Sequence, residues 1–370
     1  MPQILLLTFD VLPNRQLLGD DAALTVIYEQ LDAVSACFDN HYLQAAGPNS
    51  LLATSAIWRR LGEVLREGGL QLCVDELCET AAAEFPLPHA RCDSMPSDQI
   101  LAQLAGSRSS TFDASQRTQA LDGQDCEKRL RWVHTALPSA DGAAAERLQS
   151  LTQAAREGDW THVLITSLRG APPPAEHRFS SQLFDSWLRV PLWILTDANC
   201  CRISALTGSH DVPATLLDLL SPESPESPEL PVSAVSSRTG DVADPCDERT
   251  SASGDDAHRE GEAVDADPSD EHAVEQTPLQ FSPPVSLQAN IADVGHRPER
   301  HLLIDAAGET AIRSNAFLYA AAMPPQRPAL YAKPDDCWNV NDVSSEYLQL
   351  MQDYEWLLTS LKLRQLQSDA

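Results

Sequence analysis

Three short segments rich in apolar residues, the first of them nearly continuous, constrain the fold of this chain more than any other feature of its sequence. They cover residues 4–9, 162–168 and 190–195. Such runs indicate strands buried on both sides, which is typical of the centre of a parallel sheet. Stretches with helical spacing of apolar residues lie among them, so the alternation predicts a mostly parallel α/β sheet with helices on both faces. Asp10 directly follows the first run, and ligands bind at the carboxyl ends of such strands.

Changes in composition divide the chain into three predicted segments. Residues 1–220 carry the α/β pattern. Residues 221–283 begin with Ser-Pro-Glu repeats and have no apolar period, so we expect an acidic, disordered insertion. Residues 284–370 predict a small C-terminal α+β subdomain with short strands and a closing amphipathic helix from about Val343.

The charge of the chain is strongly negative and unevenly distributed. The net charge is −28 and the isoelectric point is about 4.5. A surface of this sign repels phosphate backbones, which argues against binding to nucleic acid or to anionic membranes. About half of the excess acidic charge lies between residues 221 and 276, a composition typical of a solvated tract.

Several further features predict a cytoplasmic protein without membrane contacts. No apolar stretch approaches the ~18 residues that a membrane-spanning helix needs. The N-terminal residues carry neither the basic region nor the cleavage site of a signal peptide. The nine cysteines have no zinc-type spacing, and we expect them to be free thiols of a reducing compartment.

The turn after the second apolar run carries a family resemblance. Residues 166–170 are Thr-Ser-Leu-Arg-Gly, and apolar segments at 188–194 and 211–220 follow in order. Together with the first strand, these segments resemble the sulfatases of the alkaline-phosphatase-like superfamily. The resemblance implies the fold of that superfamily, a mostly parallel sheet flanked by helices with a small C-terminal subdomain. Sulfatases have Thr-Ser-Asp-His-Gly at this turn, so Leu168 and Arg169 replace the implied Asp and His of the metal site.

Other segments extend the resemblance to about two thirds of the chain. A family segment is matched directly by Phe38, Asp39, Asn40 and Tyr42, and residues 311–314 resemble part of its C-terminal subdomain. The family nucleophile is a Cys or Ser that is oxidised to formylglycine. When the chain is aligned on Pro48, Ala46 stands at the nucleophile position and Ser50 at the position of the family arginine.

The resemblance also implies a Ca²⁺ ion beside the nucleophile, and a hard cation of this kind needs several oxygen ligands. Asp10 is the one implied carboxylate that is present, since Leu168 offers no ligand atom and the charge of Arg169 opposes a cation. We expect Asp10 to be a vestigial metal ligand, or else a carboxylate that caps the next helix or pairs with Arg169. We therefore expect no cofactor, or Ca²⁺ if a metal site survives. Arg169 is the candidate for binding a sulfate or phosphate group.

Two functions are consistent with this pattern. The first is a catalytically inactive sulfatase-like protein that acts by binding, because Ala46 has no heteroatom for nucleophilic attack. The alternative is an active sulfuric or phosphoric ester hydrolase with a metal site rearranged around Asp10 and Arg169. In either case the acidic tract is a candidate contact for a protein partner. We interpret the scattered histidines as surface or core residues: His41, His134, His177 and His210.

Overall fold

The computed structural model describes residues 3–19, 21–45, 60–61, 64, 70–75, 91–104, 129–137, 143–171, 183–196, 200–220, 279–306, 308–321 and 327–368. By their contacts, Met1–Pro222 and Leu279–Ala370 form one compact unit, and Glu223–Pro278 form a second. The features below belong to the first unit. Four positions singled out in the sequence lie outside the described residues: Ala46, Pro48, Ser50 and His177. Residues 221–278 of the predicted insertion also lie outside the described residues.

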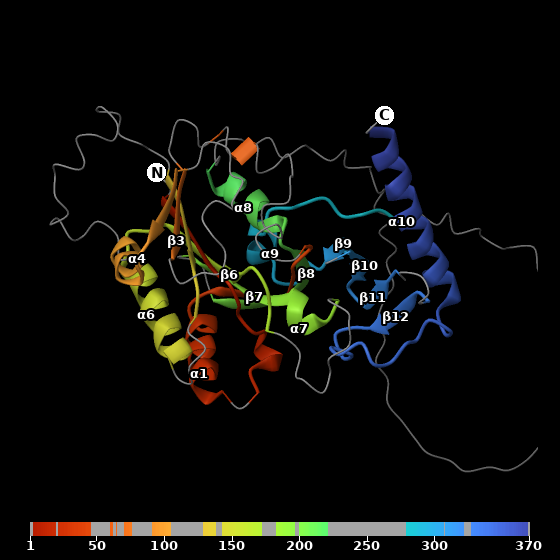
Figure 1. The fold of residues 1–370 in the computed structure, drawn as a ribbon, viewed down its shortest axis with the longest axis horizontal. Coiled ribbons are helices and arrows are strands. Elements are labelled where there is room, and N and C mark those ends of the chain that lie inside the picture. Colours follow the sequence, from red (N-terminus) through yellow and green to blue (C-terminus); the bar gives the residue numbers. More distant parts are fainter. Residues whose placement is uncertain are drawn as a thin grey trace, which may run out of the picture. The chain divides into compact units, whose positions relative to one another are not determined.

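An eight-stranded sheet forms the centre of this unit (Figure 1). Its strand order is β4-β3-β5-β1-β6-β7-β2-β8. Neighbouring strands are parallel except at β7, which is antiparallel to both β6 and β2, so the predicted mostly parallel sheet is confirmed. The strands are β1 Gln3–Phe9, β2 Ala36–Tyr42, β3 Leu70–Asp75, β4 Arg91–Met95, β5 Arg129–Thr135, β6 His162–Ser167, β7 Arg189–Leu195 and β8 Cys201–Gly208.

Helices cover both faces of this sheet, and β1 supplies side chains to both hydrophobic cores. Ile4 and Leu6 belong to the core beneath α8, whereas Leu5 and Leu7 belong to the core beneath α1, α4 and α6. Burial on both faces explains why the strand is apolar at successive positions. The helices are η1 Arg15–Leu17, α1 Ala22–Asp32, α4 Ser97–Leu104, α6 Ala143–Glu157, α7 Asp185–Leu188, α8 Asp211–Leu220 and α9 Gln288–Ala292.

A four-stranded antiparallel sheet of order β12-β11-β10-β9 forms the C-terminal part, as the sequence predicts. Tyr354, Leu357 and Leu358 of the closing helix pack against it. The elements are β9 His301–Ala306, β10 Glu309–Ser314, β11 Phe317–Ala320, β12 Ala329–Ala332 and α10 Leu348–Ser368.

The closing helix begins at Leu348, later than the prediction of about Val343. The reason is that the preceding backbone is bound to β12. The Val343 amide donates to the Leu330 carbonyl over 2.8 Å, and Asp342 Oδ1 accepts from the amides of Leu330 and Ser344. These contacts keep Asp342 and Val343 beside β12 and outside the helix.

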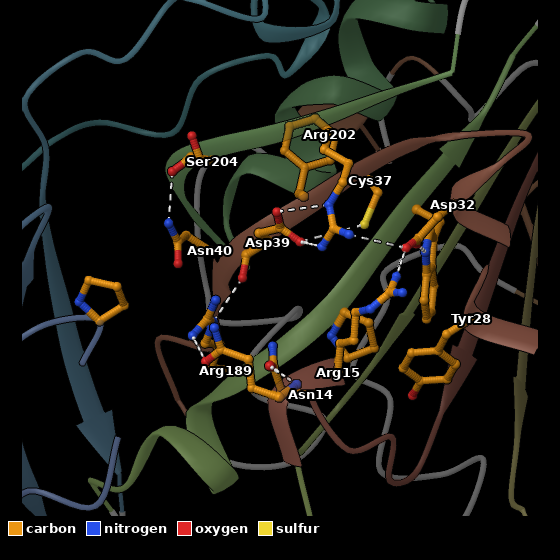
Figure 2. A pocket seen from close by; sticks show the side chains of 15 residues that line it. Asn14, Arg15, Tyr28, Asp32, Cys37, Asp39, Asn40, Arg189, Arg202 and Ser204 are labelled. Carbon is orange, nitrogen blue, oxygen red and sulfur yellow. Dashed lines mark hydrogen bonds and ion pairs between the residues drawn. The ribbon is translucent and has the colours of Figure 1, made fainter. Parts of the chain in front are cut away.

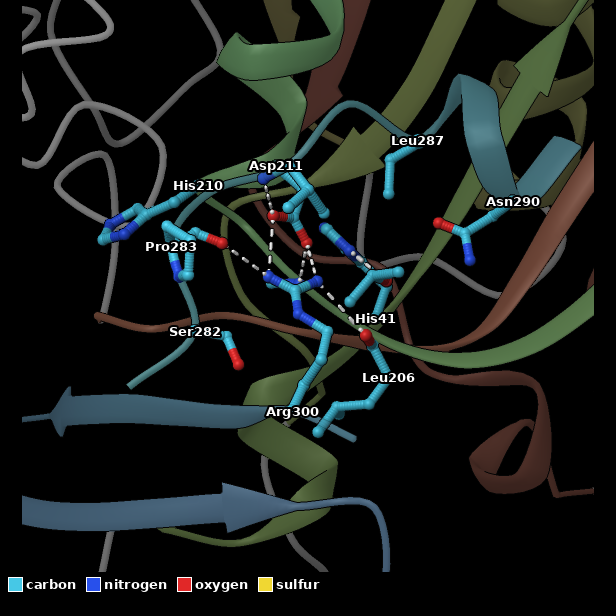
Figure 3. A network of polar contacts seen from close by, with 12 residues as sticks. His41, Leu206, His210, Asp211, Ser282, Pro283, Leu287, Asn290 and Arg300 are labelled. Atoms are coloured by element: carbon cyan, nitrogen blue, oxygen red, sulfur yellow. Dashed lines mark hydrogen bonds and ion pairs between the residues drawn. The ribbon is translucent and has the colours of Figure 1, made fainter. Parts of the chain in front are cut away.

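A buried ion pair joins α8 to the chain that returns after residue 278 (Figure 3). Arg300 Nη1 and Nη2 lie 2.6 and 3.0 Å from Asp211 Oδ2 and Oδ1. Arg300 also donates to the Pro283 carbonyl, and the Val285 amide donates to Asp211. Residues 279–283, at the end of the predicted insertion, are therefore held on the first unit. In the described residues, no helix is long and apolar enough to cross a membrane.

Candidate functional site

Asp10 and His134 form a buried pair at the carboxyl edge of the central sheet. They come together because β1 and β5 are parallel neighbours, with Phe9 opposite Thr135 in the register. The Asp10 amide donates to the Thr135 carbonyl over 3.1 Å. His134 Nε2 lies 2.8 Å from Asp10 Oδ1, and both side chains are almost wholly buried. A carboxylate and an imidazole therefore meet where ligands bind in this class of fold.

Two further side chains orient the His134 ring. Trp132 Nε1 donates to Thr8 Oγ1 over 2.7 Å, and Thr8 Oγ1 lies 3.0 Å from His134 Nδ1. Every group is satisfied when the Thr8 hydroxyl donates to Nδ1 and the imidazole proton sits on Nε2, facing Asp10. The row Trp132–Thr8–His134–Asp10 is thus a continuous set of hydrogen bonds inside the sheet.

The sequence predicts His134 as a surface or core residue, and it gives no sign of the contact with Asp10 that the structure shows. The two residues are 124 positions apart, and nothing local predicts that β5 lies beside β1. His41 is likewise fully buried, and its Nδ1 lies 3.0 Å from Thr207 Oγ1. Burial lowers the pKa of His41 to about 4, so this imidazole is neutral near pH 7.

The turn at 166–170 lies beside Asp10, because β6 is the other parallel neighbour of β1. The Leu168 amide donates to the Phe9 carbonyl over 2.9 Å, and the Leu12 amide donates to the Arg169 carbonyl over 3.2 Å. The Leu168 side chain is 1% exposed and belongs to the apolar core on the α8 face. Arg169 is half-buried at the same turn. The structure thus brings Asp10, Leu168 and Arg169 together, and anion binding by Arg169 stays a prediction.

Gly170 closes this turn against α7. Its amide donates to the Trp187 carbonyl over 2.8 Å. A Cβ atom at this position would lie 1.9 Å from the Ser186 carbonyl oxygen, which is closer than non-bonded atoms approach a Cβ. Glycine is therefore required here for the close approach of two backbones.

The described side chains at this site do not fit a Ca²⁺ ion. Ca²⁺ takes six to eight oxygen ligands. The site offers the Asp10 carboxylate, an imidazole, the apolar Leu168 and the cationic Arg169. Within the described ranges, no three His, Cys, Asp or Glu side chains gather as a metal site would require. In this set of side chains, Asp10 is better described as a carboxylate hydrogen-bonded to His134 than as a ligand of a hard cation.

Comparison with known proteins rests on structure, since no protein-family model and no curated protein matches the sequence. A 2-O GAG sulfatase superimposes with a TM-score of 0.57 at 10% identity, over 98% of this chain and 92% of that one. A protein solved with its substrate D-glucosamine-2-N,6-O-disulfate gives 0.53 at 11% identity, over 99% and 98%. A phosphonate monoester hydrolase from Silicibacter pomeroyi gives 0.51 at 10%, over 99% and 95%. The chain therefore has the alkaline-phosphatase-like fold of the sulfatases.

Proposed function

We propose that this chain is a catalytically inactive protein of the sulfatase fold that acts by binding. The observation that carries the proposal is Leu168, an apolar side chain packed into the core directly beside Asp10. A side chain without a lone pair cannot bind a cation or transfer a proton. Asp10 Oδ1, in turn, faces His134 Nε2 rather than a second carboxylate. The positions next to the strand end thus serve packing and internal hydrogen bonding.

Calcium titration followed by thermal unfolding tests this proposal. A ligand that binds only the native state raises the unfolding temperature, by an amount that grows with ligand concentration. We expect Ca²⁺ to shift the wild type and the variant Asp10→Asn equally, because the acidic tract is the same in both. A stabilisation of the wild type that Asp10→Asn loses would contradict the proposal.

One observation favours the alternative, a hydrolase of sulfuric or phosphoric esters with a rearranged site. A buried imidazole oriented by a carboxylate is a recurring arrangement for general acid–base chemistry, and His134 and Asp10 are 2.8 Å apart. Arg169 at the adjacent turn would stabilise negative charge on an ester oxyanion. Such an enzyme would lose turnover with Asp10→Asn and with His134→Gln. Arg156→Gln, on the exposed last turn of α6, is the matched control that would leave turnover unchanged.

We further propose a cytoplasmic location and a protein partner for the acidic tract. Free cysteines in the described part of the chain support a reducing compartment, and they include Cys37, Cys200, Cys201 and Cys337. The partner proposal rests on the excess of acidic charge in residues 221–276. A variant that replaces Glu223–Pro278 by a Gly/Ser linker keeps Asp211, Pro283 and Arg300 in place. Capture of the same partners by this variant and by the wild type would contradict the partner proposal.

A further inference from the structure

A second cluster of charged side chains surrounds a pocket that shares no lining residue with the Asp10–His134 row (Figure 2). Arg15, Arg189 and Arg202 lie on three sides of it. The walls come from η1, α1, β2, β7 and β8, and the cavity volume is about 220 Å³. Drug-sized ligands occupy pockets of roughly 300–1,000 Å³, so this pocket suits a smaller molecule.

Two of the three arginines have carboxylate partners. Arg202 Nη2 and Nε donate to Asp39 Oδ1 and Oδ2 over 2.6 and 3.2 Å. Arg15 pairs with Asp32, which also accepts from Trp193 Nε1. These ion pairs form the rim, since the side chains of Arg202 and Arg15 are 50% and 33% exposed.

Arg189 differs because it is 4% exposed and has no carboxylate partner among the described residues. Its Nε donates to the Asp39 carbonyl over 2.8 Å, and its Nη1 donates to Gln16 Oε1 over 2.7 Å. Nη2 has no hydrogen-bond partner in the described part of the chain. Burying a charged group without an opposite charge is costly, so an anion beside Arg189 would lower the free energy of this site.

The backbone of β2 helps to build the pocket. Its register shifts between Phe38 and Asn40 against β8, as in a β-bulge. Four consecutive residues of β2, from Cys37 to Asn40, line the pocket beside this irregularity. Asn40 Oδ1 and Ser204 Oγ are buried without a hydrogen-bond partner among the described residues. Of these two atoms, the Ser204 hydroxyl can donate a hydrogen bond to an anion, whereas the Asn40 amide oxygen only accepts.

We propose that this pocket binds a small oxyanion, a phosphate, sulfate or carboxylate group, with Arg189 as its principal ligand. Three guanidinium groups face two carboxylates in the lining, a local charge of +1 in a chain of net charge −28. Guanidinium nitrogens match the oxygens of these anions in geometry and charge. The proposal does not depend on whether the Asp10 site is active.

Isothermal titration of the full chain at low ionic strength tests the site, with inorganic phosphate, inorganic sulfate and succinate as separate probes. We expect saturable binding of at least one probe, and the probe that binds most tightly tells whether the site prefers a tetrahedral anion or a carboxylate.

Arg202→Gln removes a rim cation and leaves Asp39 unpaired, so it should weaken binding about tenfold. Asp39→Asn removes the competing negative charge and should tighten binding. Arg156→Gln, with the same charge change on distant α6, should have little effect because salt screens distant charges.

The opposite signs expected for Arg202→Gln and Asp39→Asn separate ligand binding from a general loss of structure. Arg189→Gln should abolish binding, with folding checked by circular dichroism. If Arg189→Gln does not fold, the two rim variants decide the question. Absence of binding for all three probes would overturn the proposal, as would equal affinities in the wild type and both rim variants.

Discussion

Gly170 shows how a single residue fixes the turn beside Asp10. A Cβ there would lie 1.9 Å from the Ser186 carbonyl oxygen, and a backbone atom cannot move aside as a flexible side chain can. We therefore predict that Gly170→Ala lowers the free energy of unfolding by at least about 1–3 kcal/mol. Gly295→Ala is the control, since its nearest atom is a side-chain oxygen of Asp293 at 3.2 Å. Urea denaturation that gives equal losses for both variants would refute this explanation.

His41 predicts a dependence of stability on pH. Its pKa is lowered to about 4, mainly by burial, while the unfolded chain keeps the ordinary value of 6.5. The unfolded state therefore binds the proton more readily, so this contribution to stability is complete above pH 6.5 and is lost as the pH falls toward 4. We expect it to cost about 2 kcal/mol between pH 7 and pH 5. In urea denaturation at both pH values, His41→Gln should lose correspondingly less, and parallel losses would exclude this role.

At the scale of single residues, the sequence predicts the role of some site residues and not of others. Asp10 is predictable because a carboxylate at the end of an apolar run stands out locally. His134 becomes informative only once β5 is known to pair with β1, a long-range contact that no local pattern encodes. The burial of Arg189 is equally hidden, because its setting depends on Gln16 and on the irregular strand around Asp39.

At the scale of elements, apolar runs predict the central strands well, because burial on both faces leaves a direct mark on composition. The start of α10 is predicted less well. Its apolar period extends back to Val343 in the sequence, but contacts with Leu330 hold that segment on β12. Periodicity records which residues are buried, whereas the start of α10 also depends on the tertiary contacts of the residues that precede it.

The ion pair between Arg300 of the returning chain and Asp211 at the start of α8 gives a prediction for these elements (Figure 3). Removing one partner leaves the other charge buried and unpaired. We expect Arg300→Met to lower the free energy of unfolding by about 3–5 kcal/mol. Arg202→Gln breaks a half-exposed pair and should cost no more than about 1 kcal/mol. Chemical denaturation that ranks the two variants in the reverse order would contradict the structural role of Arg300.

At the scale of the whole molecule, the fold class follows from the order of strands and helices, and the sulfatase likeness follows from short segments in the correct order. Contacts join Met1–Pro222 and Leu279–Ala370 into one compact unit that excludes Glu223–Pro278. We therefore predict that replacing Glu223–Pro278 by a Gly/Ser linker changes the unfolding temperature by no more than a few degrees. Differential scanning calorimetry that shows a large loss would mean that the first unit depends on the excised residues.

The central claim is that a sulfatase fold here carries a site whose side chains serve packing rather than ester hydrolysis. The most direct measurement is the rate of hydrolysis of an aryl sulfate and of a phosphonate monoester, with and without added Ca²⁺. The wild type, Asp10→Asn and His134→Gln would be assayed together. We predict rates for the wild type that are indistinguishable from those of both variants. Turnover that both substitutions abolish, while Arg156→Gln retains it, would contradict the claim and establish the chain as a hydrolase.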